Sequence, residues 1–219
     1  MIDIERRGSV AIVHQRNGEN RFNAESLARW HTVLDELEST DGPMAVVTTG
    51  EGKFYSNGLD LDWMGAHTDQ AAAVVEGVHR LLGRVLGFPR IVVAAVNGHA
   101  FAGGGMLAVA HDFVVMREDR GFWCLPEVDL GLPLTEPMHA VVTAKLPRVT
   151  AHEAMMTGRR YTATEALTAG IVHRIAPEDE VLETAVAWAD EYAGKTRHVI
   201  AEHKMLSYGP AIRLCGITT

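Results

Sequence analysis

Short apolar runs alternate along the chain with longer segments that have the periodicity of amphipathic helices. Five runs rich in valine, isoleucine and alanine predict buried strands over residues 9–14, 44–49, 91–96, 113–116 and 171–175. The segments between these strands are long enough to serve as crossover connections, which parallel pairing of consecutive strands requires. The alternation therefore predicts an α/β fold in which helices flank a mostly parallel sheet.

Helical spacing is clearest between these runs and in the last third of the chain. Asn23 stands where a helix cap is expected, and Ser26 follows three residues later. No internal repeat is present, so we predict one core domain over residues 1–175 and a C-terminal helical region over residues 176–219. The predicted helices cover residues 27–37, 59–64, 71–86, 106–111, 137–144, 163–169 and 178–195, and others begin near residues 151 and 199; residues 50–58 and 97–105 are predicted to be loops.

The composition of the chain argues against several classes of binding partner. The 219 residues carry a formal net charge of −8, which argues against a nucleic-acid partner because such proteins present a basic face. Two cysteines form neither a CxxC pair nor a metal-ligand cluster, so we expect no metal site and a reducing compartment, the cytoplasm. No apolar run is long enough to span a membrane, so we expect no membrane partner.

Two glycine-bearing segments each follow a predicted strand, at residues 53–61 and 98–105. The second opens a helix, where free N–H groups and the helix dipole favour an anion or a developing oxyanion. It matches neither the GxxxxGK[ST] nor the GxGxxG nucleotide-binding pattern. Its three consecutive glycines, Gly103 to Gly105, are equally consistent with close packing of a helix against a strand.

A third segment, Leu125-Pro126-Glu127-Val128-Asp129-Leu130-Gly131, places two carboxylates among apolar residues. Such carboxylates are commonly solvated loop charges. The functional interpretation is a carboxylate beside an apolar pocket, where desolvation raises its pKa so that it can accept and return a proton near neutral pH.

Taken in order, these three segments and residues 156–172 resemble the crotonase family, the enoyl-CoA hydratase/isomerase superfamily. The resemblance implies a spiral of repeated ββα units with a helical C-terminal part, which is shorter here than in the family. It also implies a homo-oligomer, a trimer or a hexamer. The pattern is most similar to that of the Δ3,Δ2-enoyl-CoA isomerases.

The resemblance also implies the site. The backbone N–H groups of Leu59 and Gly103 would form the oxyanion hole, and Glu127 would be the catalytic carboxylate. Hydratases of the family use a second glutamate, and its position falls on Met106, which cannot exchange a useful proton. Residues expected to contact the substrate or CoA are Ala24, Asn57, Gly58, Asp60, Gly104 and Met106, although Asp60 also fits a helix cap.

The implied activity is isomerisation of a fatty 3-enoyl-CoA to a 2-enoyl-CoA. The CoA thioester is the substrate, and no permanently bound cofactor is expected. A hydratase that uses Glu136 as a substitute acid is also consistent with the resemblance, although a carboxylate at a helix start is commonly structural. The same resemblance is compatible with a decarboxylase or hydrolase of the family, and with a CoA-binding protein that has no catalytic activity.

Overall fold

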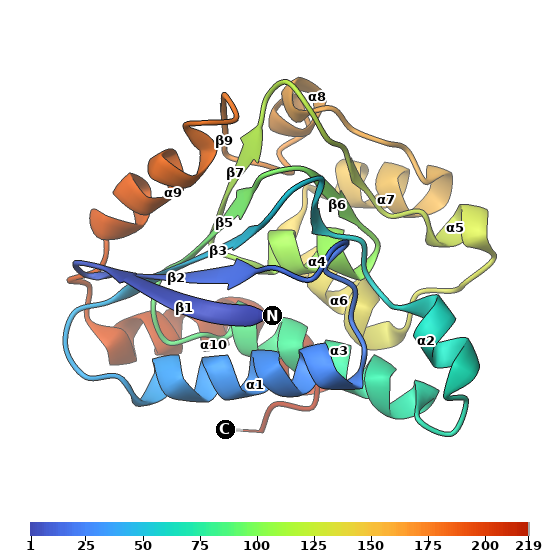
Figure 1. The fold of residues 1–219 in the computed structure, drawn as a ribbon, viewed down its shortest axis with the longest axis horizontal. Helices are drawn as coiled ribbons and strands as arrows, with labels where there is room; N and C mark the ends of the chain where they lie inside the picture. Colours follow the sequence, from blue (N-terminus) through green and yellow to red (C-terminus); the bar gives the residue numbers. More distant parts are fainter. Residues whose placement is uncertain (219) are drawn as a thin grey trace.

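A six-stranded sheet forms the centre of the computed structural model, which describes residues 1–218 (Figure 1). The strand order is β1–β2–β3–β5–β7–β9. β1 pairs antiparallel with β2, and each remaining neighbouring pair is parallel. The strands are β1 (Ile2–Arg7), β2 (Val10–Gln15), β3 (Ala45–Gly50), β5 (Val92–Val96), β7 (Phe113–Arg117) and β9 (Arg174–Ala176).

Side chains of the central strands alternate between two apolar layers, as expected for a period of two. On one face, Val47, Val93 and Val115 pack in a cluster with α9 (Val181–Asp190). Their neighbours along the strands belong to the larger core on the opposite face, which α1, α3, α4 and α10 cover (Figure 1). These helices are α1 (Ala24–Ser39), α3 (Ala71–Leu86), α4 (Gly103–Ala110) and α10 (Arg197–Leu214).

A second, three-stranded parallel sheet lies beside the large one and has the order β4–β6–β8. β4 and β6 occupy segments that the sequence predicted to be loops, because three residues are too few to show a strand periodicity. Each follows a strand of the large sheet and precedes a helix, which produces the expected ββα units. The three strands are β4 (Phe54–Ser56), β6 (His99–Phe101) and β8 (Trp123–Cys124).

Several predicted boundaries need correction. The edge strand β1 precedes the first predicted strand. The strand predicted at 171–175 is the shorter β9, which ends one residue past the predicted domain boundary. The long helix predicted over residues 178–195 is confined to α9. The remaining helices are α2 (Leu61–Ala66), α5 (Glu127–Leu130), α6 (Glu136–Lys145), α7 (Arg148–Thr157) and α8 (Ala163–Thr168), of which α5 was not predicted.

The predicted cap of α1 is confirmed. The Asn23 side chain accepts a hydrogen bond from the Ser26 N–H at 3.0 Å, and the Ser26 hydroxyl accepts one from the Asn23 N–H at 2.9 Å. This reciprocal arrangement satisfies two N–H groups at the helix start. Within residues 1–218, no helix is both long and apolar enough to cross a membrane.

Candidate active site

The two glycine-bearing segments meet where β4 and β6 pair in parallel. A Cβ atom built on Gly58 would lie 2.8 Å from the Ala102 Cβ and 2.9 Å from the Gly103 backbone nitrogen. Gly58 also has a φ of +77°, so the position favours glycine both sterically and conformationally. Ala102 has a φ of +50°, a strained value that the tight turn into α4 imposes. The close approach brings two backbone N–H groups to one place.

These two N–H groups belong to Leu59 and Gly103. The chain around Leu59 is fixed, because the Phe22 N–H donates to the Gly58 carbonyl at 2.7 Å and the Asp60 N–H donates to the Phe22 carbonyl at 2.9 Å. Gly103 is the first residue of α4, where the helix supplies no acceptor. In the part of the chain that the structure describes, neither N–H donates a hydrogen bond. Both residues line one cavity, so both donors are available to an oxyanion there.

The three consecutive glycines at the start of α4 have two different roles. Gly103 lines the cavity. A Cβ on Gly104 would overlap the carbonyl oxygen of Ser56, and one on Gly105 would lie 3.1 Å from the Ala100 carbonyl oxygen. Close packing of a helix against a strand therefore accounts for Gly104 and Gly105, and Gly103 is the glycine of the motif that lines the cavity.

Glu127 lines the same cavity as the first residue of α5. Its Oε2 atom is buried and has no hydrogen-bond partner within residues 1–218. Burial raises the pKa of the Glu127 carboxyl above its ordinary value, and a backbone hydrogen bond offsets part of that rise. Asp129, two residues later, is exposed. The interpretation of Asp129 as a solvated charge therefore agrees with the structure, whereas Glu127 has the environment of a proton-transferring group.

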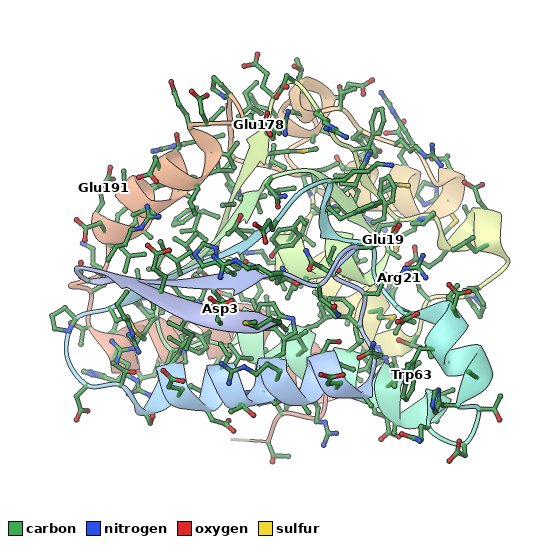
Figure 2. All side chains as sticks on the ribbon, viewed as in Figure 1. Asp3, Glu19, Arg21, Trp63, Glu178 and Glu191 are labelled. Atoms are coloured by element: carbon green, nitrogen blue, oxygen red, sulfur yellow. The ribbon has the colours of Figure 1, made fainter. Side chains whose placement is uncertain are left out.

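The cavity has a volume of about 550 Å³. Asp62 also lines it, but its side chain is 91% exposed and accepts a hydrogen bond from Arg21 at 2.8 Å. Arg21 also donates to Glu19 at 2.7 Å, and these two partly exposed side chains lie near α2 in Figure 2. Glu127 is therefore the buried carboxylate of a largely apolar wall, whose side chains include Leu59, Leu61, Met64, Val75, Phe101, Leu130, Leu132, Pro133 and Met138.

Residues 5–207 match the family model described as enoyl-CoA hydratase/isomerase. The chain belongs to the enoyl-CoA hydratase/isomerase family. Enoyl-CoA delta isomerase 3 of Arabidopsis thaliana is 34% identical over 205 residues, which cover 89% of this chain and 86% of that protein. A putative enoyl-CoA hydratase of Thermus thermophilus is 37% identical over 199 residues, which cover 88% of this chain and 78% of that protein.

A solved structure shows the same fold. The human mitochondrial delta3-delta2-enoyl-CoA isomerase superposes with a TM-score of 0.91 at 24% identity, covering 97% of this chain and 85% of that chain. The crotonase-like architecture expected from the resemblance is thereby confirmed. The family comparisons identify the chain as an enzyme of the enoyl-CoA hydratase/isomerase family. Its relatives include a protein named as an isomerase and one named as a hydratase.

The structure places Met106 differently from the prediction that it contacts substrate. Its side chain is fully buried in the main core, and it is absent from the cavity wall. The position is nevertheless apolar and lies in the first turn of α4, three residues after Gly103. Residues 103–110 of α4 include no acidic side chain. α4 therefore supplies no second carboxylate to the cavity.

The predicted contact residues are only partly brought together. Asn57 lines the cavity, and Gly58 packs closely against Ala102 and Gly103, which also line it. Asp60 caps α2 by accepting from the Trp63 N–H at 3.2 Å, which confirms its structural interpretation. Asp60, Gly104, Ala24 and Glu136 are not part of this cavity wall. Gly104 packs on β4, whereas Ala24 and Glu136 are exposed at the starts of α1 and α6, so their contact with substrate or CoA stays a prediction.

Several residues of the cavity wall have no distinguishing signal in the sequence. Arg160, Cys124 and Thr135 come from three different segments, and only the tertiary fold brings them together. Thr135 carries one local signal, because it stands where a helix cap is expected, immediately before the acidic first turn of α6. Nothing in the local sequence indicates that it faces a cavity.

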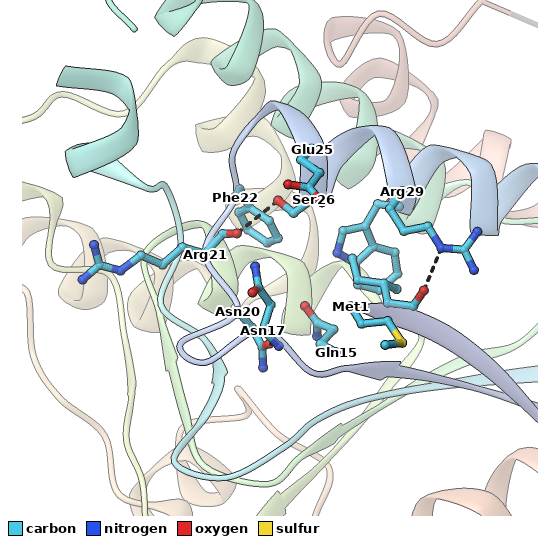
Figure 3. A pocket seen from close by; sticks show the side chains of 11 residues that line it. Met1, Gln15, Asn17, Asn20, Arg21, Phe22, Glu25, Ser26 and Arg29 are labelled. Carbon is cyan, nitrogen blue, oxygen red and sulfur yellow. Dashed lines mark hydrogen bonds between the residues drawn. The ribbon is translucent and has the colours of Figure 1, made fainter. Parts of the chain in front are cut away.

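A second, smaller hollow lies between β1 and the start of α1 (Figure 3). Its volume is about 110 Å³, and it contains none of the predicted site residues. Hydrogen bonds from Arg29 to the Ile2 carbonyl at 2.7 Å and from Ser26 to the Arg21 carbonyl at 3.1 Å cross or border it (Figure 3). Its size is insufficient for an acyl chain with its thioester. The cavity beside Glu127 is the candidate active site because Leu59, Gly103 and Glu127 line it together.

Proposed function

We propose that the protein isomerises a 3-enoyl-CoA to a 2-enoyl-CoA by transferring one proton through Glu127. One observation carries the proposal: a carboxylate with a buried, unpartnered oxygen shares a cavity with two free backbone N–H groups, within the residues that the structure describes. An acyl thioester needs both elements, because loss of its α-proton places negative charge on the carbonyl oxygen.

In the proposed reaction, the thioester oxygen accepts hydrogen bonds from the N–H groups of Leu59 and Gly103. Glu127 removes a proton from C2, and the double-bond electrons delocalise into a dienolate whose oxygen carries the negative charge. The protonated Glu127 then returns its proton to C4, which leaves the double bond between C2 and C3. Atoms and charges balance without water or a second acid. A raised pKa strengthens Glu127 as a base while keeping it able to hold the proton.

The choice of isomerisation over hydration rests on the residues at the two positions where a second acid could stand. Met106 is buried and apolar where hydratases of the family are expected to place their second glutamate. Glu136, the substitute acid considered from the sequence, is exposed and lies outside the cavity wall. The apolar wall opposite Glu127 suits an acyl chain better than an activated water, which needs several polar partners.

The test compares Glu127→Gln with wild type in two assays, isomerisation of a 3-enoyl-CoA and hydration of a 2-enoyl-CoA. Glutamine has nearly the same shape but cannot accept the proton, so we expect isomerisation to fall by about 100-fold or more. Asp129→Asn is the matched control, since it removes an exposed carboxylate from the same helix and should leave turnover near wild type. Near-normal isomerisation by Glu127→Gln, or hydration faster than isomerisation in wild type, would contradict the proposal.

A further inference from the structure

One of the polar side chains that line the cavity lies where residues of α3 and α6 form its wall. Thr135 caps α6, and it lines the cavity together with Glu127. Its hydroxyl accepts from the Met138 N–H at 3.5 Å and lies 2.8 Å from Nε2 of His79, which belongs to α3. The segment between Glu127 and Thr135 curves along the cavity, since Leu130, Leu132 and Pro133 line it as well.

The Thr135 hydroxyl has one hydrogen-bonding position left. A hydroxyl can donate one hydrogen bond and accept two, and Met138 and His79 account for two of these three. Within residues 1–218, it makes no further hydrogen bond. Either tautomer of His79 leaves one position on the hydroxyl, as an acceptor or as a donor. The neighbouring wall, which includes Val75 and Met138, offers no polar partner for it.

The cap of α6 does not need the hydrogen bond between Thr135 and His79. A threonine alone can cap a helix, and the cost of burying an imidazole is recovered only through its hydrogen bonds. Burial lowers the pKa of the half-buried His79, with the nearby Glu76 acting in the opposite direction, and this favours the neutral ring. The pair is thus a hydroxyl held by a neighbouring ring beside apolar side chains, in a cavity that Asn57 and Arg160 also line.

We infer that Thr135, positioned by His79, is a specificity-determining residue that selects acyl chains carrying a hydroxyl group beyond the reacting carbons. A hydroxyl is the ligand group that fits both tautomers, because it can donate to Thr135 or accept from it. The inference rests on the proposed function only in that an acyl chain occupies this cavity. Sites that hydrogen-bond a ligand hydroxyl discriminate against the analogue that lacks it, because a buried polar group is then left without a partner.

The experiment measures dissociation constants by calorimetry for octanoyl-CoA and for octanoyl-CoA bearing one hydroxyl at C5, C6, C7 or C8. These saturated ligands cannot be isomerised, so binding is read without turnover. For one hydroxyl position, we expect wild type to bind the hydroxylated ligand about three- to tenfold more tightly than unsubstituted octanoyl-CoA. This ratio is the equivalent of one neutral hydrogen bond. Thr135→Val should abolish this ratio, His79→Leu should reduce it, and Thr135→Ser should retain it.

Within one variant, the ratio of the affinities for the hydroxylated and the unsubstituted ligand is independent of a general loss of stability. If Thr135 and His79 had a purely structural role, this ratio would therefore be the same in the variants as in wild type. A ratio near one for every position in wild type, or a preference that persists in Thr135→Val, would overturn the inference while leaving isomerisation intact. Failure of octanoyl-CoA itself to bind would overturn it together with the proposed function.

Discussion

Burial of Glu127 has an energetic consequence that is separate from catalysis. The folded protein raises the pKa of this carboxyl, so the native state binds its proton more tightly than the unfolded chain does. Stability contributed by such a group is present at low pH and declines as pH rises from the ordinary carboxyl value through the raised one. The charged Glu127 therefore destabilises the native state near neutral pH, as expected where a site is arranged for function.

Glu127→Gln should consequently stabilise the protein at pH 7, because glutamine removes the buried charge. The gain should shrink at pH 4, where the wild-type carboxyl is largely protonated in both states. Thermal unfolding of both proteins at the two pH values measures this difference. A variant that is less stable than wild type at pH 7 would show that the carboxylate has a stabilising partner and would contradict its assignment as an unpaired base.

Gly58→Ala tests the close approach of the two glycine-bearing segments. The new methyl group would press on Ala102 and on the Gly103 nitrogen, so we expect turnover to fall by about 100-fold through displacement of an oxyanion donor. The positive φ of +77° should cost about 1–2 kcal/mol of stability as well. Steady-state kinetics and urea unfolding measure the two effects.

Gly8→Ala is the matched control for this substitution. Gly8 has a φ of +58°, yet a Cβ there would have no neighbour within 4 Å. It should lose similar stability and keep full turnover. Equal losses of turnover in both variants would show that Gly58 acts only through the backbone fold.

At the scale of elements, α10 is fixed to the sheet by a buried ion pair. Lys204 donates to the Asp112 carboxylate at 2.7 Å and to the Arg90 carbonyl at 2.9 Å, and Asp112 also accepts from the Val92 N–H. The Lys204 side chain is only 6% exposed, and desolvation lowers the pKa of its ammonium group despite the nearby carboxylate. Breaking one member of such a pair costs more than replacing both.

Lys204→Met should therefore destabilise the protein by about 3 kcal/mol, since it leaves the Asp112 carboxylate buried without its cation. The double variant Lys204→Met with Asp112→Asn should recover part of that loss, because asparagine still accepts from Val92 and carries no charge. Urea unfolding of the two single variants and the double variant gives the coupling energy. Additive losses would mean that the two side chains stabilise α10 independently.

How far the sequence predicted these elements depended on their length. Apolar runs of five or six residues and helices such as α3 were recognisable, because their periodicity extends over enough residues. β4, β6 and α5 were not, since three or four side chains show no clear period and tertiary pairing decides their conformation. Ordered motifs predicted Leu59, Gly103 and Glu127 of the candidate site, whereas the positions of Thr135 and Arg160 in the cavity wall depend on how distant elements meet.

At the scale of the whole molecule, the candidate site collects residues from Arg21 to Arg160 around one cavity. Parallel pairing of β4 with β6 is what allows this, because it places the ends of both strands at the same edge. Two large apolar side chains outside the cavity are exposed to solvent: Val149 is 82% exposed and Leu206 is 83% exposed. Single exposed apolar side chains are normal on protein surfaces, so these two residues alone do not indicate an interface.

We nevertheless expect a homo-oligomer, because the family resemblance implies one. The mass in solution should be three or six times the chain mass of 23.8 kDa. Sedimentation velocity at micromolar concentration distinguishes these states from a monomer. A single species at the chain mass would contradict the expectation without affecting the assignment of the site.

Transfer of a labelled proton tests the proposed reaction most directly. A 3-enoyl-CoA carrying deuterium at both C2 positions is converted in a single turnover, and mass spectrometry locates the label in the 2-enoyl-CoA product. If Glu127 carries the proton within a cavity that excludes water, part of the deuterium should appear at C4, and Glu127→Gln should form almost none of this product. A C4 position that contains only solvent hydrogen, or product formation that persists in Glu127→Gln, would contradict the role of Glu127.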